Sequence, residues 1–395
     1  MKKNILLVFV LLFGLFSCKK PEIEQPVVEI EHALFMYMPW PADGDLTSYF
    51  NQNIEAFEKI LNVSLLRNNK LIVFLSSSTL EASMFEFKYE KNAIVRTTLK
   101  TYKFDNPVYT TAAGITSILN DVKGFASAKR YSMIVSGHGL GWLPVGTQPR
   151  TMLREGYEKY HWEYEDGPMT RWFGGTTSNI QTEITTLAKG ITDAEIKMDY
   201  ILFDNCYMST IETAYDLRKV TNYIIASPTE IMDYGFPYHI IGKFLLGNVD
   251  LQGVCEGFYN FYLNYTYPYG TIAVTATAEL DNLAAVMKYI NQKFSFDISL
   301  LSKVQRMDGY SPVIFFDMGD YVSKLCTDVD LLALFNYHFE RVVPLKWRQY
   351  TQSYYSASMG TVAIHSFSGV TISDPSINSK AITTKLETAW YKATH

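Results

Sequence analysis

Cysteine is scarce in this sequence, with four in 395 residues and no C-x-x-C pair. So few cysteines cannot build a disulfide framework. HExxH and paired Cys/His spacings are also missing, so no zinc site is expected. The phosphate-binding loops GxGxxG and GxxxxGK[ST] do not occur, nor does the GxSxG of serine hydrolases. Nucleotide binding and serine-hydrolase chemistry therefore have no support in the sequence.

An excess of basic residues is lacking too. The chain has 35 Lys+Arg against 40 Asp+Glu, a formal net charge of -5, so it carries no electrostatic footprint for nucleic acid. Hydrophobic residues make up 48% and charged residues 19%, which is typical of a folded globular protein. The length suggests two to three domains, or one large domain with additions.

The N-terminus has the pattern of an export signal. Lys2 and Lys3 precede an apolar run from Ile5 to Phe16, which is shorter than the roughly 20 residues that span a bilayer. The run ends in Leu-Phe-Ser-Cys18, which resembles a bacterial lipobox. We expect 1–17 to be removed, Cys18 to carry lipid, and 18–32 to be a polar tether to a membrane of the cell envelope. The alternative is an ordinary secretory signal with a chance cysteine.

From residue 33 the chain alternates strand-like and helix-like segments, which predicts an α/β fold with a mostly parallel sheet covered by helices on both faces. Strands are expected at 33–38, 71–75, 131–136, 200–203 and 223–226, a hairpin at 84–89 and 93–102, and helices at 46–61, 111–125, 179–189 (capped by Ser178) and 209–218. After about 250 we expect a strand at 271–277, a helix at 280–290, a strand at 313–316 with a helix from about 320, and a hairpin of 360–367 with 370–372.

Two of the predicted buried strands end in residues that can do chemistry. His138 follows the first between Gly137 and Gly139, and Cys206 follows the second. Carboxyl ends of neighbouring parallel strands share a cleft, and a Cys/His pair there supplies a thiolate nucleophile and a proton donor. The N–H groups of Gly139 and Cys206 are candidates for an oxyanion hole. Taken singly, each residue is also compatible with a structural role, as a core thiol and a turn histidine.

Several blocks around these residues resemble the clostripain-like cysteine peptidases of clan CD. They are SGHGLGW (136–142), RWFGG (171–175), DYILFDNCYMSTIETAYDLR (199–218) and IIASPTEIMDYGFPY (224–238), with VTATAELDNLAAV (274–286), FFDMGDYV (315–322) and TAWYKAT (388–394) later. The resemblance implies a caspase-haemoglobinase fold over 33–250, with a C-terminal α/β region over 251–395 packed on it. It places His138 and Cys206 at the family's catalytic positions.

The same resemblance implies cleavage after Arg or Lys by means of acidic residues in the S1 pocket, which holds the side chain before the scissile bond. Asp204 matches the acid of the family's D-x-C block, and Glu230 and Asp233 lie where a second acid is expected. Alternatively, Asp204 caps the next helix, and Glu230 and Asp233 are solvated. Relatives are activated by a cut between the His and Cys blocks, here expected at Arg150 or Arg154.

We expect a monomer acting on polypeptides, without a metal or cofactor; only the resemblance leaves a calcium requirement open, since no EF-hand-like run occurs. Cys255 and Cys326 are predicted to be buried, inert thiols, and Glu212 and Arg171 to be structural. Two rival functions remain. One is a catalytically silent surface lipoprotein that binds through the same fold, and the other is a cysteine-dependent amidase or acyl transferase acting on small molecules.

Overall fold

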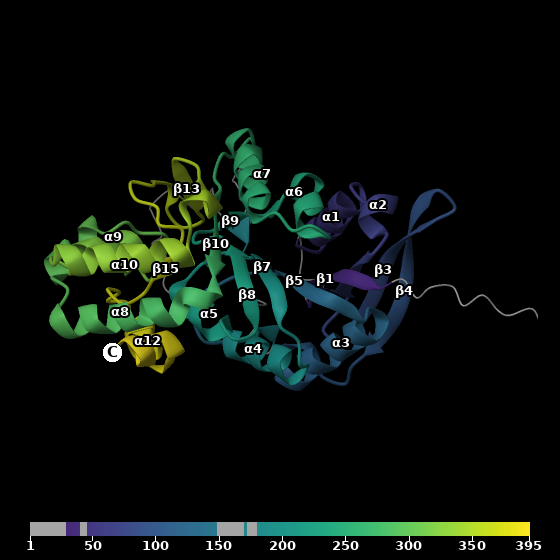
Figure 1. The fold of residues 1–395 in the computed structure, drawn as a ribbon, viewed down its shortest axis with the longest axis horizontal. Coiled ribbons are helices and arrows are strands. Elements are labelled where there is room, and N and C mark those ends of the chain that lie inside the picture. The colour runs from purple at the N-terminus through teal and green to yellow at the C-terminus, as the bar shows by residue number, and fades with distance from the viewer. Residues whose placement is uncertain (1–28, 40–45, 148–169, 172–179) are drawn as a thin grey trace, which may run out of the picture.

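A computed structural model of the chain describes residues 29–39, 46–147, 170–171 and 180–395. Within these residues nine strands form one sheet, which runs through the middle of the molecule (Figure 1). In spatial order they are β12 (Arg348–Tyr350), β10 (Thr271–Ala276), β8 (Thr221–Ala226), β7 (Met198–Asp204), β5 (Ala128–Ser136), β1 (Ile30–Met38), β2 (Asn69–Ser76), β3 (Glu81–Glu90) and β4 (Ala93–Lys103).

The central strands are parallel, as predicted. β8, β7, β5, β1 and β2 pair in parallel, while β10 and β12 at one edge and β3 and β4 at the other are antiparallel. β3 and β4 are the predicted hairpin. β1 begins at Ile30, inside the segment expected to be a tether. β10 and β12 come from the region after 250 and extend the same sheet.

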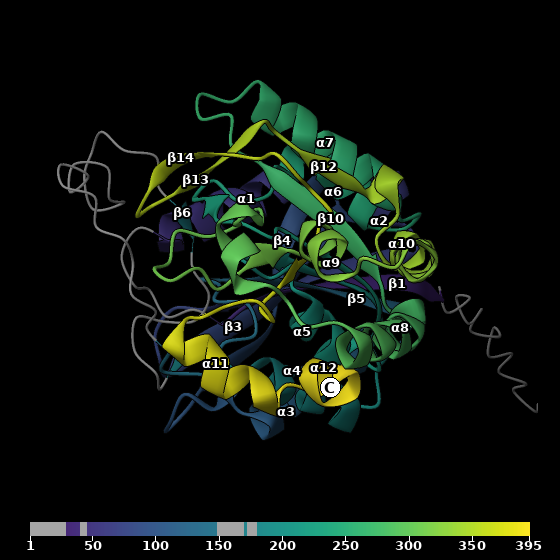
Figure 2. The same ribbon diagram turned by 90° about the vertical axis from the view of Figure 1, so that its left-hand side faces the viewer.

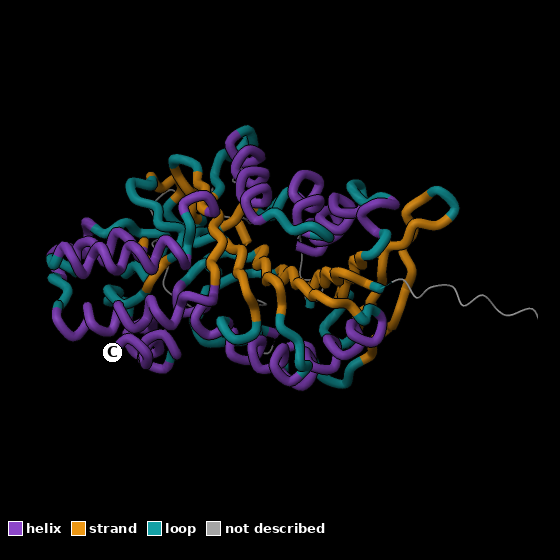
Figure 3. Tube along the Cα trace, viewed as in Figure 1, coloured by secondary structure: helices purple, strands orange, loops and turns teal. Residues whose placement is uncertain are grey.

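Helices cover both faces of the sheet, as Figure 3 shows by the purple layers on either side of the orange strands. One layer holds α1 (Leu46–Glu58), α2 (Val63–Leu66), α6 (Tyr238–Leu245) and α7 (Leu251–Leu263), and the other holds α3 (Ala112–Phe125), α4 (Ile184–Asp193) and α5 (Ile211–Leu217). Side chains of a strand point alternately to its two faces. Accordingly, Phe35 and Tyr37 of β1 join the core under α3, while Leu34 and Met36 join the core under α1.

Burial on both faces explains why the central strands read as unbroken apolar runs. From Ala33 to Met38 no side chain is more than 3% exposed. Burying a side chain of this kind stabilises a fold by about 1.5–3 kcal/mol. The helices satisfy their end groups locally: the Thr111 hydroxyl caps α3 by accepting the Gly114 N–H at 3.1 Å.

The C-terminal region adds a group of helices at one end of the sheet, which faces the viewer in Figure 2. They are α8 (Leu280–Lys293), α9 (Met318–Leu325), α10 (Val329–Val342) and α12 (Ala389–Thr394), with α11 (Ser379–Thr384) beside them. Three small two-stranded sheets complete the described part: β6 (Thr170–Arg171) with β9 (Ile231–Met232), β11 (Phe316–Asp317) with β15 (Thr371–Ile372), and β13 (Ser353–Ser356) with β14 (Gly360–Ala363).

Three local predictions were wrong. The helix expected from 179 begins at Ile184, and before it the side chains of Gln181 and Glu183 accept the backbone N–H groups of Gly146 and Val145. Its expected cap, Ser178, lies outside the described residues. The strand expected at 313–316 is reduced to β11, because 313–315 belong to a buried loop. The hairpin of 360–367 with 370–372 does not form, since β14 pairs with β13 and β15 pairs with β11.

No helix of the described residues is both long and apolar enough to cross a lipid bilayer. The predicted signal, lipobox and Cys18 lie outside these residues, as do Arg150 and Arg154.

Candidate active site

The register of β5 and β7 brings the predicted histidine and cysteine together. The last paired residues of these parallel strands are Ser136 and Asp204. His138 lies two residues beyond the first and Cys206 two residues beyond the second. The segments that follow β5 and β7 therefore leave the same edge of the sheet side by side. The Asn205 side-chain amide joins them by donating to the His138 carbonyl oxygen at 3.4 Å.

Gly139 lies in direct contact with the backbone of the predicted nucleophile. A Cβ at this position would lie 2.0 Å from the Cys206 carbonyl oxygen and 2.7 Å from its nitrogen. Real Cβ atoms do not approach other atoms so closely, so only glycine fits without a shift of the backbone. The backbones of residues 139 and 206 are therefore in direct contact.

The Cys206 sulfur is held against β9. The Ile231 N–H donates to Sγ at 3.3 Å, and the Ile231 carbonyl oxygen lies 3.9 Å from Sγ. A backbone donor on the sulfur stabilises negative charge there. The side chain of Cys206 has no exposed surface, while His138 is half-buried.

Asp204 ends β7 and is fully buried on the side of α1 and α6. Its Oδ2 accepts hydrogen bonds from the Asn53 amide at 3.2 Å and the Tyr238 hydroxyl at 3.1 Å. The alternative of a helix cap is wrong for this residue, because the next helix, α5, is capped by the Thr210 hydroxyl. These two donors hold the Asp204 carboxyl group in a fixed orientation at the end of β7.

The other two predicted acids differ in their surroundings. Glu230 is 8% exposed, so its solvated alternative is wrong. Its Oε1 accepts the Tyr207 hydroxyl at 2.6 Å, and its Oε2 accepts the Ala357 N–H at 3.0 Å. Asp233 is half-buried in the turn after β9 and accepts the N–H of Tyr234 at 2.9 Å.

No group of three or more His, Cys, Asp or Glu side chains among the described residues could hold a metal ion. A surface cavity of about 530 Å³ lies at the opposite, amino edge of the sheet, lined in part by Arg67, Arg130 and Lys243. None of the predicted site residues lines this cavity, so it is separate from the site around His138 and Cys206.

Comparison with known proteins gives a consistent family. The model of the clostripain family matches residues 156–369. A secreted C11 cysteine protease from Bacteroides thetaiotaomicron, "iotapain", is 52% identical, with a TM-score of 0.83 over 93% of this chain and 100% of its own. The chain belongs to the clostripain family. It is a cysteine peptidase with that family's mostly parallel, caspase-like sheet.

Two further family structures are similar. A clostripain from Bacteroides thetaiotaomicron ATCC 29148, in complex with the peptide inhibitor BTN-VLTK-AOMK, is 58% identical, with a TM-score of 0.55 over 57% of this chain and 99% of its own. An inactive zymogen C11 protease from Parabacteroides distasonis is 26% identical, with a TM-score of 0.72 over 93% of this chain and 99% of its own. No curated protein matches the chain.

The other two described cysteines of this clostripain-family chain are buried structural thiols, as predicted. Burial raises the pKa of the Cys255 thiol, which donates to the Trp347 carbonyl oxygen at 3.3 Å. A thiol with a raised pKa is a poor nucleophile at neutral pH because little thiolate forms. Cys326 lies at the C-terminal end of α9, and its thiol donates to the Asp328 carbonyl oxygen at 3.5 Å.

The contacts of the C-terminal segment with the loops after His138 and Cys206 were not predicted residue by residue. The Trp142 indole N–H, four residues after His138, donates to the Ser373 hydroxyl at 2.9 Å. The Ser373 N–H in turn donates to Glu212 Oε1 at 2.8 Å, on the helix that follows Cys206. The structural role predicted for Glu212 is therefore confirmed, and one segment near the chain end connects both loops.

Glu212 makes the stability of the fold sensitive to pH. Burial, and next to it the charge of Asp374, raises the pKa of its carboxyl to about 8. Lys385, whose own pKa is lowered by burial, also faces it. Since an unfolded glutamate titrates near 4.5, the folded state holds the extra proton between about pH 4.5 and 8. Stability contributed by the protonated carboxyl is complete below that window and is lost as pH rises through it.

We therefore predict that Glu212→Gln removes this loss. Glutamine keeps an acceptor for Ser373 but has no proton to release. Between pH 5 and 8, the unfolding free energy of wild type should fall relative to that of the variant by up to about 1.4 kcal/mol per pH unit. Denaturant unfolding at several pH values measures the difference. Parallel curves for the two proteins would show that Glu212 is already ionised in the folded state.

Proposed function

We propose that the protein is a lipid-anchored, exported endopeptidase that cleaves after Lys or Arg with Cys206 as nucleophile and His138 as its acid–base partner. The adjacency of residues 139 and 206 carries the proposal. It supports a single reaction centre in which the catalytic pair comes from β5 and β7, at the edge where parallel sheets hold their active residues.

The chemistry follows from these positions. The Cys206 thiolate attacks the scissile carbonyl carbon, and the carbonyl oxygen becomes an oxyanion that the N–H groups of Gly139 and Cys206 stabilise. His138 gives its proton to the leaving amine as the C–N bond breaks, which leaves a thioester on Cys206. Water, deprotonated by His138, then attacks the thioester and releases the acid product and the thiol.

The first prediction tests this pair. Cys206→Ala should reduce peptide hydrolysis by about 10⁴-fold or more, and His138→Ala should do nearly as much damage because the two act as a unit. Rates are measured with a fluorogenic lysine substrate. Cys255→Ala and Cys326→Ala are matched controls, since both delete a buried thiol. They should cost stability, on the order of 1 kcal/mol, and keep turnover. Activity retained in Cys206→Ala would refute the assignment.

A preference for basic residues is supported by Asp204. Its buried carboxyl group lies two residues before Cys206, in surroundings of low dielectric where a carboxylate strongly attracts a guanidinium or ammonium group. Asp233 adds negative charge in the turn after β9, whereas Glu230 is occupied with Tyr207 and Ala357. The peptide inhibitor bound to the 58% identical relative, BTN-VLTK-AOMK, carries lysine next to the AOMK group.

The corresponding prediction concerns the residue before the cleaved bond. Asp204→Asn should lower kcat/KM for Lys and Arg substrates by roughly 100-fold, as expected for a lost charge pair of about 3 kcal/mol. A substrate with neutral glutamine there should lose less than about threefold, because asparagine keeps an acceptor for Asn53 and Tyr238. A paired assay of the three substrates on both proteins gives the comparison. An equal loss on all of them would make Asp204 a structural residue only.

Burial of the Cys206 sulfur supports a latent form that is opened by a cut between the His and Cys blocks, at Arg150 or Arg154. The relative titled an inactive zymogen is consistent with such a step in this family. Wild type should then migrate as two fragments on a denaturing gel, and Cys206→Ala as one band. Arg150→Gln with Arg154→Gln should stay intact and inactive. A fully active wild type in one piece would contradict the cut.

The lipid anchor is supported by the lipobox-like sequence before Cys18 and by the short stretch of sequence between Cys18 and the start of β1. Wild type should partition into detergent and carry acyl chains, which mass spectrometry of the N-terminal peptide detects. Cys18→Ser should be released in soluble and active form. If wild type proves to be unacylated, the anchor is wrong and the signal is an ordinary secretory one.

A further inference from the structure

The residue after the predicted nucleophile has an unfavourable backbone conformation. Tyr207 has φ +59°, in the left-handed region that non-glycine residues rarely adopt. Such a conformation costs on the order of 1–3 kcal/mol and persists only where the surroundings enforce it. It is not required by the sheet, because Tyr207 lies beyond the end of β7. Its cause must therefore lie in the contacts of its own side chain and backbone.

Those contacts come mainly from the region after residue 250. The ring of Tyr207 stacks on Phe315, with centroids 5.2 Å apart and planes at 24°, and lies 5.6 Å from the ring of Tyr310. All three rings are at most 4% exposed. The backbone N–H of Tyr207 donates to the Thr229 carbonyl oxygen at 3.0 Å, and its hydroxyl donates to Glu230.

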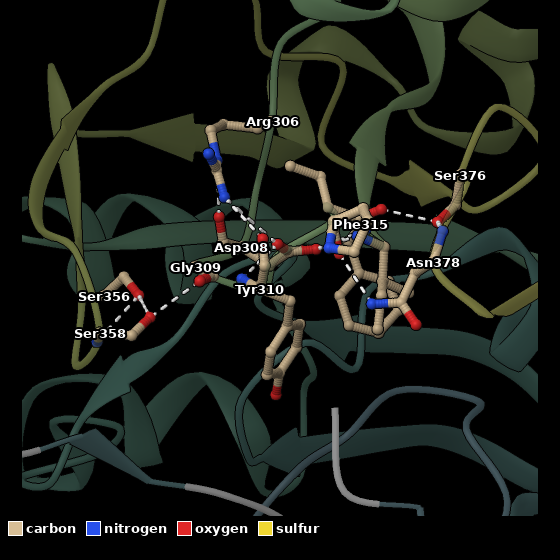
Figure 4. A network of polar contacts seen from close by, with 12 residues as sticks. Arg306, Asp308, Gly309, Tyr310, Phe315, Ser356, Ser358, Ser376 and Asn378 are labelled. Atoms are coloured by element: carbon tan, nitrogen blue, oxygen red, sulfur yellow. Dashed lines mark hydrogen bonds and ion pairs between the residues drawn. The ribbon is translucent and has the colours of Figure 1, made fainter. Parts of the chain in front are cut away.

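Phe315 and Tyr310 lie on one loop, and the Asp308 carboxylate binds backbone N–H groups at both of its ends (Figure 4). Asp308 is fully buried, and its Oδ1 accepts the N–H of Tyr310 at 2.9 Å. Its Oδ2 accepts the N–H of Ile314 at 2.8 Å and that of Phe315 at 2.5 Å. Asp308 thus fixes both ends of the loop, and the charge of Arg306, 3.9 Å from Oδ1, partly offsets the cost of burying it.

The same loop touches the segment that follows His138. Gly141 has φ +59°, and a Cβ there would lie 2.9 Å from the Tyr207 carbonyl oxygen and 3.1 Å from two ring atoms of Phe315. The ring of Phe315 therefore lies against the histidine loop and against the residue after the cysteine at once. Any shift of Phe315 changes how these two loops sit relative to each other.

We propose that Asp308 is a positioning residue for catalysis: by shaping the Tyr310–Phe315 loop it holds Tyr207 in its left-handed conformation and so fixes Cys206 relative to His138. The proposal rests on the proposed function, because it presupposes that these two residues react. It gives Glu230 a related task, since that side chain joins the Tyr207 hydroxyl to the N–H of Ala357.

The test separates positioning from plain stability by a matched pair of variants. Asp308→Asn can no longer accept N–H groups with both side-chain atoms. Asp317→Asn is the control, because Asp317 is also buried and accepts backbone N–H groups, those of Asp320 and Ser368, which lie outside the histidine and cysteine loops. Both should lower the unfolding midpoint. Kinetic constants are measured under conditions well below the unfolding midpoint. Rates are divided by the concentration of active sites, which is titrated with an irreversible lysine ketone.

In Asp308→Asn, kcat should fall by about 10- to 100-fold with KM changed less than about threefold, as expected when reacting groups are misplaced by about 1 Å. In Asp317→Asn, kcat should stay within about twofold of wild type. If Asp308→Asn does not fold, Phe315→Leu replaces it and should show the same selective loss of kcat. If the variant at position 308 or 315 keeps a kcat close to that of wild type, as the control does, the proposal is overturned.

A failure of the underlying function looks different. If the lysine ketone does not label Cys206 in wild type, or if Cys206→Ala hydrolyses peptides, the nucleophile itself is misassigned. If wild type is labelled at Cys206 and Asp308→Asn behaves as Asp317→Asn does, only the positioning role is wrong.

Discussion

The parallel pairing of β5 with β7 is the constraint on which the candidate site depends. Its register ends at Ser136 and Asp204, so the residues two positions further along each strand leave the sheet together. A ladder of backbone hydrogen bonds, within a core buried on both faces, fixes the spacing between the ends of β5 and β7. Placing reactive side chains on rigid elements in this way limits the misalignment that costs catalytic rate.

The close approach of the segments that follow β5 and β7 forces an unfavourable local backbone conformation, and contacts from the surrounding fold offset its energetic cost. Gly139 has to be glycine because the Cys206 peptide occupies the space of a Cβ. Tyr207 is not a glycine, yet it has a left-handed φ. The energetic cost of this conformation is offset by the stacking of its ring on Phe315 and by the hydrogen bond to Glu230. Strain of this kind at a functional site is stable only if the packing around it is well determined. The aromatic part of that packing, Tyr310 and Phe315, comes from residues more than a hundred positions further along the chain.

The sequence predicted the strands well because apolar runs such as 131–136 and 200–203 are buried on both faces, which makes them continuous and easy to recognise. It also predicted which residues follow those strands. Elements that depend on distant partners were missed or misplaced. β11 and β15 are two residues long and exist because they pair with each other. Residues 313–315 resemble a strand by composition, although Asp308 accepts the N–H groups of Ile314 and Phe315. The left-handed Tyr207 leaves no mark in the sequence either, since tyrosine is not a residue that favours this conformation.

The same distant contacts bear on whether the C-terminal region is a separate unit. β10 pairs with β8, and the chain after residue 250 contributes to both hydrophobic clusters, with Trp390 in one and Phe315 in the other. Ser373 links Trp142 to Glu212, and Phe315 touches Gly141 and Tyr207. A domain that only covered the catalytic part would need none of these contacts at the reactive loops. Because the C-terminal region completes the sheet and also packs behind the cysteine and histidine loops, we infer that the two regions fold and function as one unit.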